Sequence, residues 1–274
     1  MAHWKSLTDN AVADNTATNA VKATVTDSNG NPVPGQTVDF SSTVTGVNFT
    51  VSGVTDASGV ATATLTSPVA GTVPVTAEVN GSSQTVNTTF VADDSTAEIV
   101  SGALEITTDN AVADNTSTNA VKATVTDSNS NPVPGQTVDF SSTVTGVNFT
   151  VSGVTDASGV VTATLTSSVA GTVPVTAEVN GSSQTVNTTF VPDDTTATIA
   201  DADFTVTSGA VANNTDTNTL TAIVKDSNGN VVANAEVTFD VTTGAATPTS
   251  QTATTDASGV ATATWSAWSP VTTR

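Results

Sequence analysis

The sequence predicts an all-β chain built from tandem antiparallel sandwiches, and three observations support that class. Thr, Val, Ala, Ser and Asn dominate the 274 residues, a mixture that favours strands joined by polar turns. Apolar residues alternate with the period of a half-buried strand, and no helical pattern is visible. A repeat of about a hundred residues divides the chain into two complete units and a partial third.

The repeat is nearly exact between residues 8–99 and 108–199. The differences are Ala17/Ser117, Gly30/Ser130, Ala61/Val161, Pro68/Ser168, Ala92/Pro192, Ser95/Thr195 and Glu98/Thr198. The expected divisions are a vector-derived start at 1–6, repeat 1 at 7–97, repeat 2 at 98–197, an incomplete repeat 3 at 198–264 and a cloning remnant at 265–274. Repeat 3 departs from the others before two further strands, so we expect it to be poorly ordered or completed by another chain.

Within repeat 1 the alternation predicts seven strands in order. The first lies around residues 7–13. The other six are marked by residues that share a face: Val21, Ala23 and Val25; Val38 and Phe40; Phe49 and Val51; Ala61, Ala63 and Leu65; Val73, Val75, Ala77 and Val79; Val86, Thr88 and Phe90. Turn signals separate these runs at the spacing of an antiparallel sandwich.

Two turns can be assigned from residue type. In DASG, Asp56 suits the first position of a type I turn and Gly59 the fourth. Asn29 and Gly30 predict a tight hairpin turn. If that turn needs a positive φ, Ser130 in repeat 2 costs roughly 1 kcal/mol relative to glycine.

The order of the motifs carries a more specific resemblance. The run NAVKATVTDSNGNPVPGQTVDF, followed by TDASGVATATLTS and AGTVPVTAEV, resembles the bacterial immunoglobulin-like group 1 domains that occur in tandem in the intimin and invasin family of Gram-negative surface adhesins. The resemblance covers residues 7–264. It implies an all-β fold class of tandem Ig-like antiparallel β-sandwiches arranged as an elongated rod. It carries over no individual binding residue.

The charge balance argues against several classes of partner. The chain has 25 acidic against five basic residues, for a net charge of -20. Such a surface repels nucleic acid and anionic membranes. No apolar run approaches the length of a membrane span, and MAHWKSL lacks the features of a signal peptide, so we expect an excised fragment with no direct membrane insertion.

Catalytic residues are not expected. The chain has no Cys or Tyr, and its one imidazole, His3, lies in the predicted vector-derived start, so the usual nucleophile and base sets cannot be assembled. Two carboxylates could still act as acid and base. However, Asp39 and Asp139 become Thr238 in repeat 3, and Glu78 and Glu178 alternate outward. We therefore interpret these acids as a solvated face and predict neither an enzyme nor a bound cofactor.

Calcium is the one metal for which we consider candidate ligands. Asp27, Asn29 and Asn31 imitate the first three ligands of an EF-hand loop, but Pro32 and Val38 stand where that loop needs Gly and Glu, so a hairpin turn explains them better. A second possibility lies between the repeats. Acidic pairs there could bind Ca²⁺ with help from loops of adjoining domains: Asp93 and Asp94, and Asp193 and Asp194.

The leading functional hypothesis is a stalk. The resemblance implies a spacer on the extracellular side of a Gram-negative outer membrane, in a protein anchored by a separate barrel and tipped by a distal adhesin domain, both outside this fragment. The tip would contact a host-cell or bacterial surface in adhesion, virulence or biofilm formation. The alternative is that the repeats are themselves multivalent binding modules for a host protein, a glycan or one another. That alternative requires an exposed aromatic or apolar patch on each copy.

Overall fold

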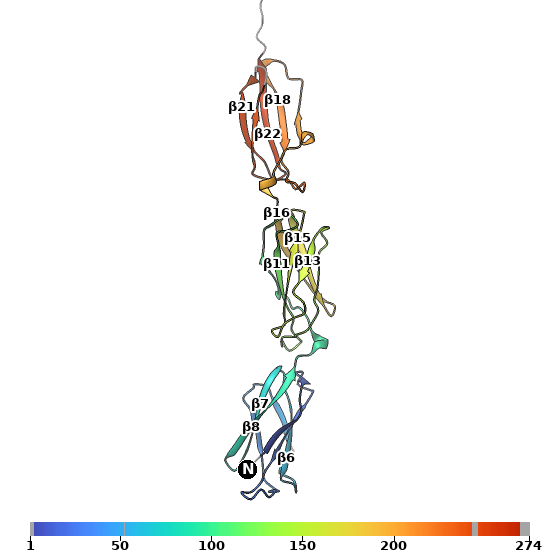
Figure 1. Ribbon diagram of the computed structural model, residues 1–274, viewed down its shortest axis with the longest axis vertical. Helices are drawn as coiled ribbons and strands as arrows, with labels where there is room; N and C mark the ends of the chain where they lie inside the picture. Colours follow the sequence, from blue (N-terminus) through green and yellow to red (C-terminus); the bar gives the residue numbers. More distant parts are fainter. Residues whose placement is uncertain (1–2, 52, 243–245, 269–274) are drawn as a thin grey trace, which may run out of the picture.

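The computed structural model describes residues 3–51, 53–242 and 246–268. Three β-sandwich units lie end to end along one long axis (Figure 1). Within the described residues the helices are single 3-10 turns: η1 (Asp94–Thr96), η2 (Asp194–Thr196) and η3 (Asp201–Asp203). None of these has the length or apolar content needed to cross a membrane. The predicted class of tandem antiparallel sandwiches is confirmed.

Unit 1 consists of two four-stranded sheets that pack face to face. The first sheet has the order β1 (His3–Thr8), β3 (Asn19–Thr24), β6 (Val60–Thr66), β5 (Asn48–Val51). The second has the order β2 (Ala11–Val12), β8 (Ser82–Val91), β7 (Gly71–Val79), β4 (Asp39–Ser42). Alternate residues of both sheets point inward, so Val21, Leu65, Val75 and Phe90 share one buried cluster.

Unit 2 repeats this topology. Its first sheet has the order β13 (Asn148–Val151), β14 (Val160–Thr166), β11 (Asn119–Thr124), β9 (Leu104–Thr108). Its second has the order β10 (Ala111–Val112), β16 (Ser182–Val191), β15 (Gly171–Val179), β12 (Asp139–Ser141).

The opening strand is divided in two, which the alternation did not predict. β1 runs antiparallel to β3, whereas β2 runs parallel to β8 in the other sheet. The break falls at Asn10, whose φ of 63° is left-handed. The Asp9 carboxylate fixes the turn by accepting a 3.0 Å hydrogen bond from the Thr88 hydroxyl of the second sheet. One predicted strand therefore serves both sheets.

Residues of the predicted vector-derived start lie in β1, while Met1 and Ala2 are outside the described residues. Lys5 is placed opposite Lys22 on β3. In unit 2 the counterpart of Lys5 is Glu105, whose carboxylate lies 2.9 Å from the Lys122 amine. Opposite charges across a strand pair are stabilising and like charges are not, so the start of unit 1 fits its sheet less well.

Both predicted turns are confirmed. The Gly59 N–H donates to the Asp56 carbonyl at 2.9 Å, which closes the DASG turn. Gly59 has φ 69°, and a Cβ there would lie 2.5 Å from the Val25 carbonyl oxygen, so only glycine fits. Gly30 and Ser130 have φ 86° and 67°, so Ser130 carries the strain expected of a non-glycine residue.

Unit 3 has a different second sheet. Its first sheet has the order β17 (Phe204–Val206), β18 (Asn213–Ile223), β22 (Val260–Trp268), β20 (Ala246–Thr247), and the second pairs β19 (Glu236–Asp240) with β21 (Ser250–Thr254). Within the described residues nothing corresponds to β15 and β16 of unit 2. A groove of about 360 Å³ opens between the sheets, lined in part by Ile199, Phe204, Leu220 and Phe239.

The described residues of unit 3 form the two sheets given above, and the expectation that this unit is poorly ordered or completed by another chain stays a prediction. Trp265, at the start of the predicted cloning remnant, is buried and packs on Phe239 with ring centroids 6.0 Å apart. The rest of the predicted remnant is divided, because β22 extends to Trp268 and residues 269–274 lie outside the described part of the chain. A large aromatic ring thus fills part of the space that two further strands would cover.

Candidate functional site at the unit junctions

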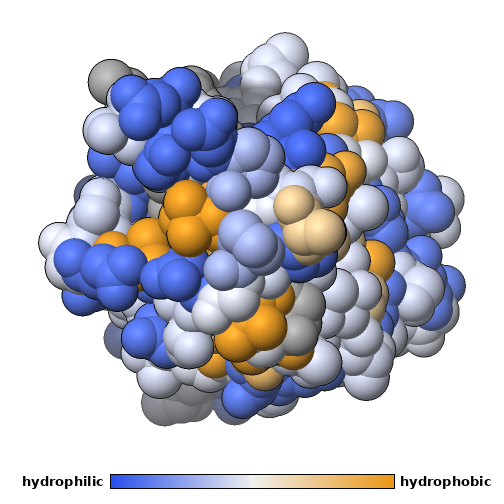
Figure 2. Space-filling view, turned by 90° about the horizontal axis from the view of Figure 1, so that it is seen from below, coloured by the Kyte–Doolittle hydropathy of each residue, from blue (hydrophilic) through white to orange (hydrophobic). Residues whose placement is uncertain are grey.

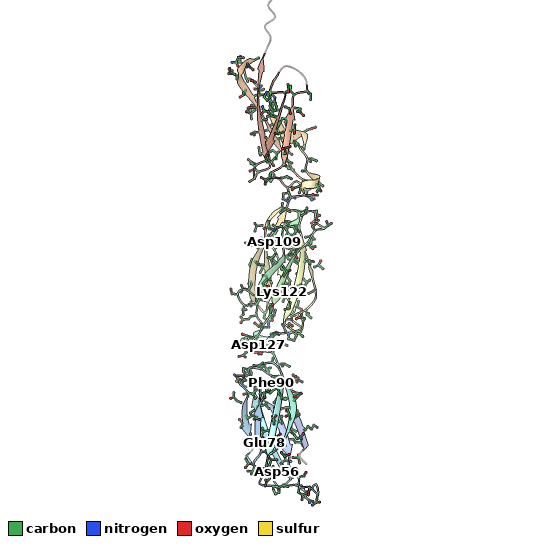
Figure 3. All side chains as sticks on the ribbon, turned by 90° about the vertical axis from the view of Figure 1, so that its left-hand side faces the viewer. Asp56, Glu78, Phe90, Asp109, Lys122 and Asp127 are labelled. Carbon is green, nitrogen blue, oxygen red and sulfur yellow. The ribbon has the colours of Figure 1, made fainter. Side chains whose placement is uncertain are left out.

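The candidate site lies where one unit meets the next. We call residues 127–131, between β11 and β12, the junction loop of unit 2; residues 27–31 and 226–230 are its counterparts. Each loop lies at the lower end of its unit in the view of Figure 1, and Figure 3 shows Asp127 beside the gap between units 1 and 2. The upper end of unit 1 presents main-chain groups from the segment after β2 and from the β6–β7 turn.

The junction loop takes its shape from its own sequence. The Asp127 carboxylate accepts hydrogen bonds from the main-chain N–H of Asn129 at 2.9 Å and of Asn131 at 2.8 Å. It also accepts one from the Asn131 side-chain amide at 2.9 Å. Asp127 and Asn131 are only 2% and 5% exposed. The Asp-x-Asn-x-Asn spacing that resembled an EF-hand therefore builds a closed turn.

The two asparagines then reach across to unit 1. The Asn131 amide oxygen accepts from the Ala70 N–H at 2.8 Å, and its amide nitrogen donates to the Pro68 carbonyl at 3.0 Å. The Asn129 amide donates to the Ala13 carbonyl at 3.1 Å. Asparagine suits this role because its side chain carries both a donor and an acceptor. All three groups contacted in unit 1 belong to the main chain.

The linker between the units completes the polar contacts. The Asp93 N–H donates to the Asp127 carboxylate at 3.1 Å, which joins linker to loop. The Asp93 carboxylate caps η1 by accepting from the N–H and hydroxyl of Ser95, at 3.0 and 2.6 Å. The Thr96 hydroxyl oxygen accepts from the Ser128 N–H at 3.3 Å.

The linker also closes the core of unit 2. Ala97 and Ile99 are 2% and 1% exposed, and they share a buried cluster with Val125, Val133 and Val179. Burying an isoleucine side chain contributes about 2–3 kcal/mol. The segment that connects the units is thus also part of the core of the second unit.

The second junction repeats the first. The Asn228 side-chain amide donates to the Ala113 carbonyl at 2.9 Å, and the Asn230 side-chain amide donates to the Ser168 carbonyl at 3.1 Å. The Asn230 amide oxygen accepts from the Ala170 N–H at 2.8 Å. The Asp226 carboxylate accepts from the Asp193 N–H at 3.1 Å. The Pro68/Ser168 exchange leaves the junction unchanged because only the carbonyl is used.

The acidic pairs weighed as calcium ligands do lie at the junctions, and the first carboxylate of each pair is hydrogen-bonded within the linker. Asp93 and Asp193 cap η1 and η2 through their carboxylates. The Asp94 carbonyl accepts from the Asn180 side-chain amide at 3.0 Å. Across the described part of the chain, no group of three or more His, Cys, Asp or Glu side chains is close enough together to hold a metal ion.

Hydrogen bonds also set the ionisation of these acids. The Ser95 hydroxyl, more than any other group, holds the pKa of Asp93 below its usual value, although the nearby Asp14 charge opposes this. Burial alone would raise the pKa of Asp226, but hydrogen bonds from Asn230 and from the Asp193 N–H outweigh it, so that pKa is also lowered. The charged forms of Asp93 and Asp226 are therefore favoured at the junctions.

The carboxylates weighed as catalytic acids lie elsewhere. Asp39 is opposite Glu78 on β4 and β7, and Asp139 is opposite Glu178 in unit 2. All four side chains are exposed. Figure 3 places Glu78 along the side of unit 1 and away from the junction.

The junction role of the loop was missed from the sequence, which assigned these residues to a turn alone. One signal was available. Asp, Ser, Asn and Asn recur at the same spacing in all three copies, although the fourth residue of the loop and the residues after it vary. A turn needs only the aspartate and the residue with positive φ, so the two unchanging asparagines indicated a further partner.

Comparison with known proteins identifies one domain family in all three units. The profile of the family described as bacterial Ig-like domain (group 1) matches residues 4–91, 101–191 and 201–272. The inverse autotransporter adhesin YeeJ of Escherichia coli strain K12 is 34% identical over 265 residues. That match covers 91% of this chain but only 11% of the relative.

Two solved structures share the arrangement of units. The structure of Yersinia pseudotuberculosis InvD superposes with a TM-score of 0.68 at 22% identity, over 99% of this chain and 85% of that one. The Escherichia coli adhesin FdeC superposes with a TM-score of 0.64 at 25% identity, over 98% of this chain and 88% of that one. The resemblance found in the order of the motifs is confirmed.

Proposed function

Because the chain belongs to the family of bacterial Ig-like domains (group 1), we propose that it is a stalk segment of a bacterial cell-surface adhesin. One observation carries the proposal: the same set of hydrogen bonds joins successive units at both junctions. Because the junction is the same each time, every added unit lengthens the chain of units by the same amount. Such an array serves to hold a distal binding domain away from the cell.

The relatives support a cellular setting for the proposed stalk. YeeJ is an inverse autotransporter adhesin and FdeC an adhesin by name, and this chain spans about a tenth of YeeJ. We place the chain on the extracellular side of a Gram-negative outer membrane, between a barrel anchor and a distal adhesin domain. The partner of that tip would be a host-cell or bacterial surface. The role is mechanical and involves no catalysis.

The rival function, multivalent binding by the units themselves, has less support. It calls for an aromatic or large apolar patch repeated on each copy. In units 1 and 2 no phenylalanine side chain is exposed. The exposed large apolar residues that recur in both units are valines: Val51, Val54 and Val69 in unit 1, and Val151, Val154 and Val169 in unit 2. Valine side chains provide less contact area than the aromatic residues that dominate binding hot spots.

We further propose that the junctions hold without metal. Asn131 and Asp127 already join linker, loop and neighbouring unit through direct hydrogen bonds. A calcium ion needs six or more oxygen ligands, and the Asp93 carboxylate is engaged by Ser95.

Small-angle X-ray scattering of the chain, with calcium and with a chelator, tests both proposals. Each unit adds on the order of 40 Å, judged from strands of about ten residues plus loops. We expect a maximum dimension above about 100 Å that is the same in both solutions. A compact particle would refute the stalk, and a rod that bends only with chelator would restore the calcium site.

A matched pair of variants sharpens the test. Asn131→Ala together with Asn230→Ala removes the asparagine contacts at both junctions and is expected to give a more flexible particle. Asn31→Ala makes the same change in the junction loop of unit 1, which contacts no other unit within the described residues, and is expected to leave the scattering unchanged. Binding of the chain to cells that depends on Val54 and Val154 would favour the rival function.

A further inference from the structure

A cluster of polar side chains joins the beginning and the end of unit 2. We call Asp109, Asn119 and Thr188 the polar clasp of this unit. The Asp109 carboxylate accepts from the Thr188 hydroxyl and from the Thr189 N–H, both at 2.7 Å. The Asn119 side chain donates to the Thr189 carbonyl at 2.8 Å and accepts from the Ala111 N–H at 2.9 Å. Because Asn119 and Thr188 are fully buried, these bonds form away from water, where an unpaired polar group is costly.

The clasp reinforces a short main-chain contact. β10 runs parallel to β16, and the two strands are paired over only two residues each. The Asn110 N–H donates to the Thr189 carbonyl at 3.0 Å, and the Ala113 N–H donates to the Val191 carbonyl at 2.8 Å. Each such bond contributes only about 0.5–1.5 kcal/mol to stability. The side chains of the clasp therefore supply much of the attachment between β10 and the last strand.

Unit 1 contains the same clasp, formed by Asp9, Asn19 and Thr88. The Thr88 hydroxyl donates to the Asp9 carboxylate at 3.0 Å, and the Thr89 N–H donates to it as well. The Asn19 side chain donates to the Thr89 carbonyl at 2.8 Å and accepts from the Ala11 N–H at 3.0 Å. Asn19 and Thr88 are fully buried, as their counterparts are. The clasp is thus a property of the sandwich unit itself.

The clasp lies across the direction in which a stalk is pulled. The units follow one another along one axis (Figure 1), and the view along that axis has a compact outline (Figure 2). The chain enters unit 2 from the linker at its lower end and leaves after β16 at its upper end, near Asp109 (Figure 3). Tension on the two ends therefore pulls β10 and β16 in opposite directions along their length. Because the bonds between them lie across the strands, they resist this sliding together instead of opening one after another.

We propose that the polar clasp is a mechanical clamp that sets the lifetime of each sandwich unit under tension. This inference rests on the proposed stalk function, because a stalk whose tip is attached to a surface is pulled along its axis. Ala113 follows β10 and is buried in one cluster with Phe190, so loss of β10 from the sheet would open the core. A unit of roughly 90 residues would then extend to about 300 Å, at about 3.4 Å per residue.

A matched carboxylate lies elsewhere in the same unit. Asp156, in the DASG turn, accepts from the main-chain N–H groups of Ser158 at 2.8 Å and Val160 at 3.0 Å. These partners lie outside β10 and β16, so tension does not act on their bonds first. Forced unfolding is governed by the rate of unfolding rather than by equilibrium stability. Truncating Asp156 should therefore lower thermal stability without shortening the lifetime under tension, whereas truncating Asp109 should do both.

Single-molecule force spectroscopy at constant force tests the proposal on the full chain held by its two ends. One double variant, Asp9→Ala with Asp109→Ala, removes the carboxylate of both clasps. The other, Asp56→Ala with Asp156→Ala, removes both turn carboxylates. We expect the first to shorten the lifetime of the folded units roughly tenfold or more, because bonds to a charged acceptor are lost from the barrier. The second is expected to change the lifetime by less than about threefold.

Thermal unfolding of both double variants gives the equilibrium stability with which the lifetimes are compared. Equal shortening of the lifetime by the two variants, at equal loss of thermal stability, would overturn the proposal. An unchanged lifetime for the clasp variant would overturn it as well.

A second variant keeps the test available if the alanine variants do not fold. Thr88→Val with Thr188→Val removes only the hydroxyl bonds of the clasp, and valine keeps the shape and strand preference of threonine. We expect the lifetime under tension to shorten about threefold or more. A lifetime equal to that of the unchanged chain would contradict the clamp.

The force experiment is independent of the scattering experiment. Scattering from the unloaded chain reports whether the units form a rod, and the lifetime under tension reports how each unit resists pulling. A long rod whose lifetime does not depend on the clasp would refute the clamp and leave the stalk standing. A compact particle would refute the stalk, and with it the role proposed for the clasp.

Discussion

The two junctions share their hydrogen bonds but differ in their apolar contacts. Ile99 enters the core of unit 2 and is 1% exposed, whereas its counterpart Ile199 at unit 3 is 42% exposed. The polar contacts are equal because they involve only a loop, a linker and main-chain groups. The apolar contacts differ because Val179, on β15, helps to cover Ile99, and the described residues of unit 3 have no such strand. The hydrogen bonds of a junction therefore depend only on nearby residues, whereas the burial of its isoleucine depends on the strands of the unit that follows the linker.

The largest effect is expected from truncating these isoleucines. Ile99→Ala should lower the free energy of unfolding of unit 2 by about 2–4 kcal/mol, because it leaves a cavity in a closed core. Ile199→Ala should cost less than about 1 kcal/mol, since much of that side chain already faces solvent. Differential scanning calorimetry of the two variants measures the contrast. Equal losses in the free energy of unfolding would mean that the two isoleucines are equally buried.

The buried aspartates come next. Asp127→Ala and Asp226→Ala should each cost roughly 2 kcal/mol, because each leaves buried amide groups of its loop without an acceptor. Similar values at the two junctions are expected, in contrast to the isoleucines. Asp27→Ala is the matched control and should cost less, because the groups it leaves at the end of unit 1 are open to water. Chemical denaturation, with scattering to follow flexibility, checks both points.

Acid is expected to weaken the second junction by a smaller amount, because protonation weakens the contacts of Asp226 without deleting the side chain. Its pKa is lower in the folded chain than the value of about 4 of an unfolded aspartate. Its contribution to stability is therefore present above about pH 4 and is lost as the pH falls through the folded pKa. The thermal midpoint of unfolding should therefore decrease as the pH is lowered below about 4. Asp226→Asn should reduce that dependence, and an identical pH profile for the variant would contradict this account.

The smallest effect concerns the turn inside the loop. Ser130→Gly should stabilise unit 2 by about 0.5–1 kcal/mol, because glycine adopts the positive φ of this position at no steric cost. Gly229→Ser should destabilise unit 3 by a similar amount. A thermal unfolding series on the two exchanges is sufficient. If either exchange also altered the rod dimensions, the loop would contribute to the junction through more than its aspartate and asparagines.

Much of the architecture was determined by the sequence alone. Apolar alternation located most of the strands, and Gly59 and Asp56 placed a turn because both are required by backbone geometry. The order of the motifs was enough to identify the family. These features are local or periodic, so they can be recognised along the chain without knowing which strands meet.

Only the tertiary structure showed which strands and units contact one another. The division of the opening strand at Asn10 depends on Thr88, far along the chain in the other sheet. The three junction loops have nearly the same sequence, yet Asn131 is buried by unit 1 and Asn31 is not. Ile99 and Ile199 likewise differ because of strands that lie beyond them in sequence. Burial depends on which surfaces come together, and an isolated stretch of sequence does not contain that information.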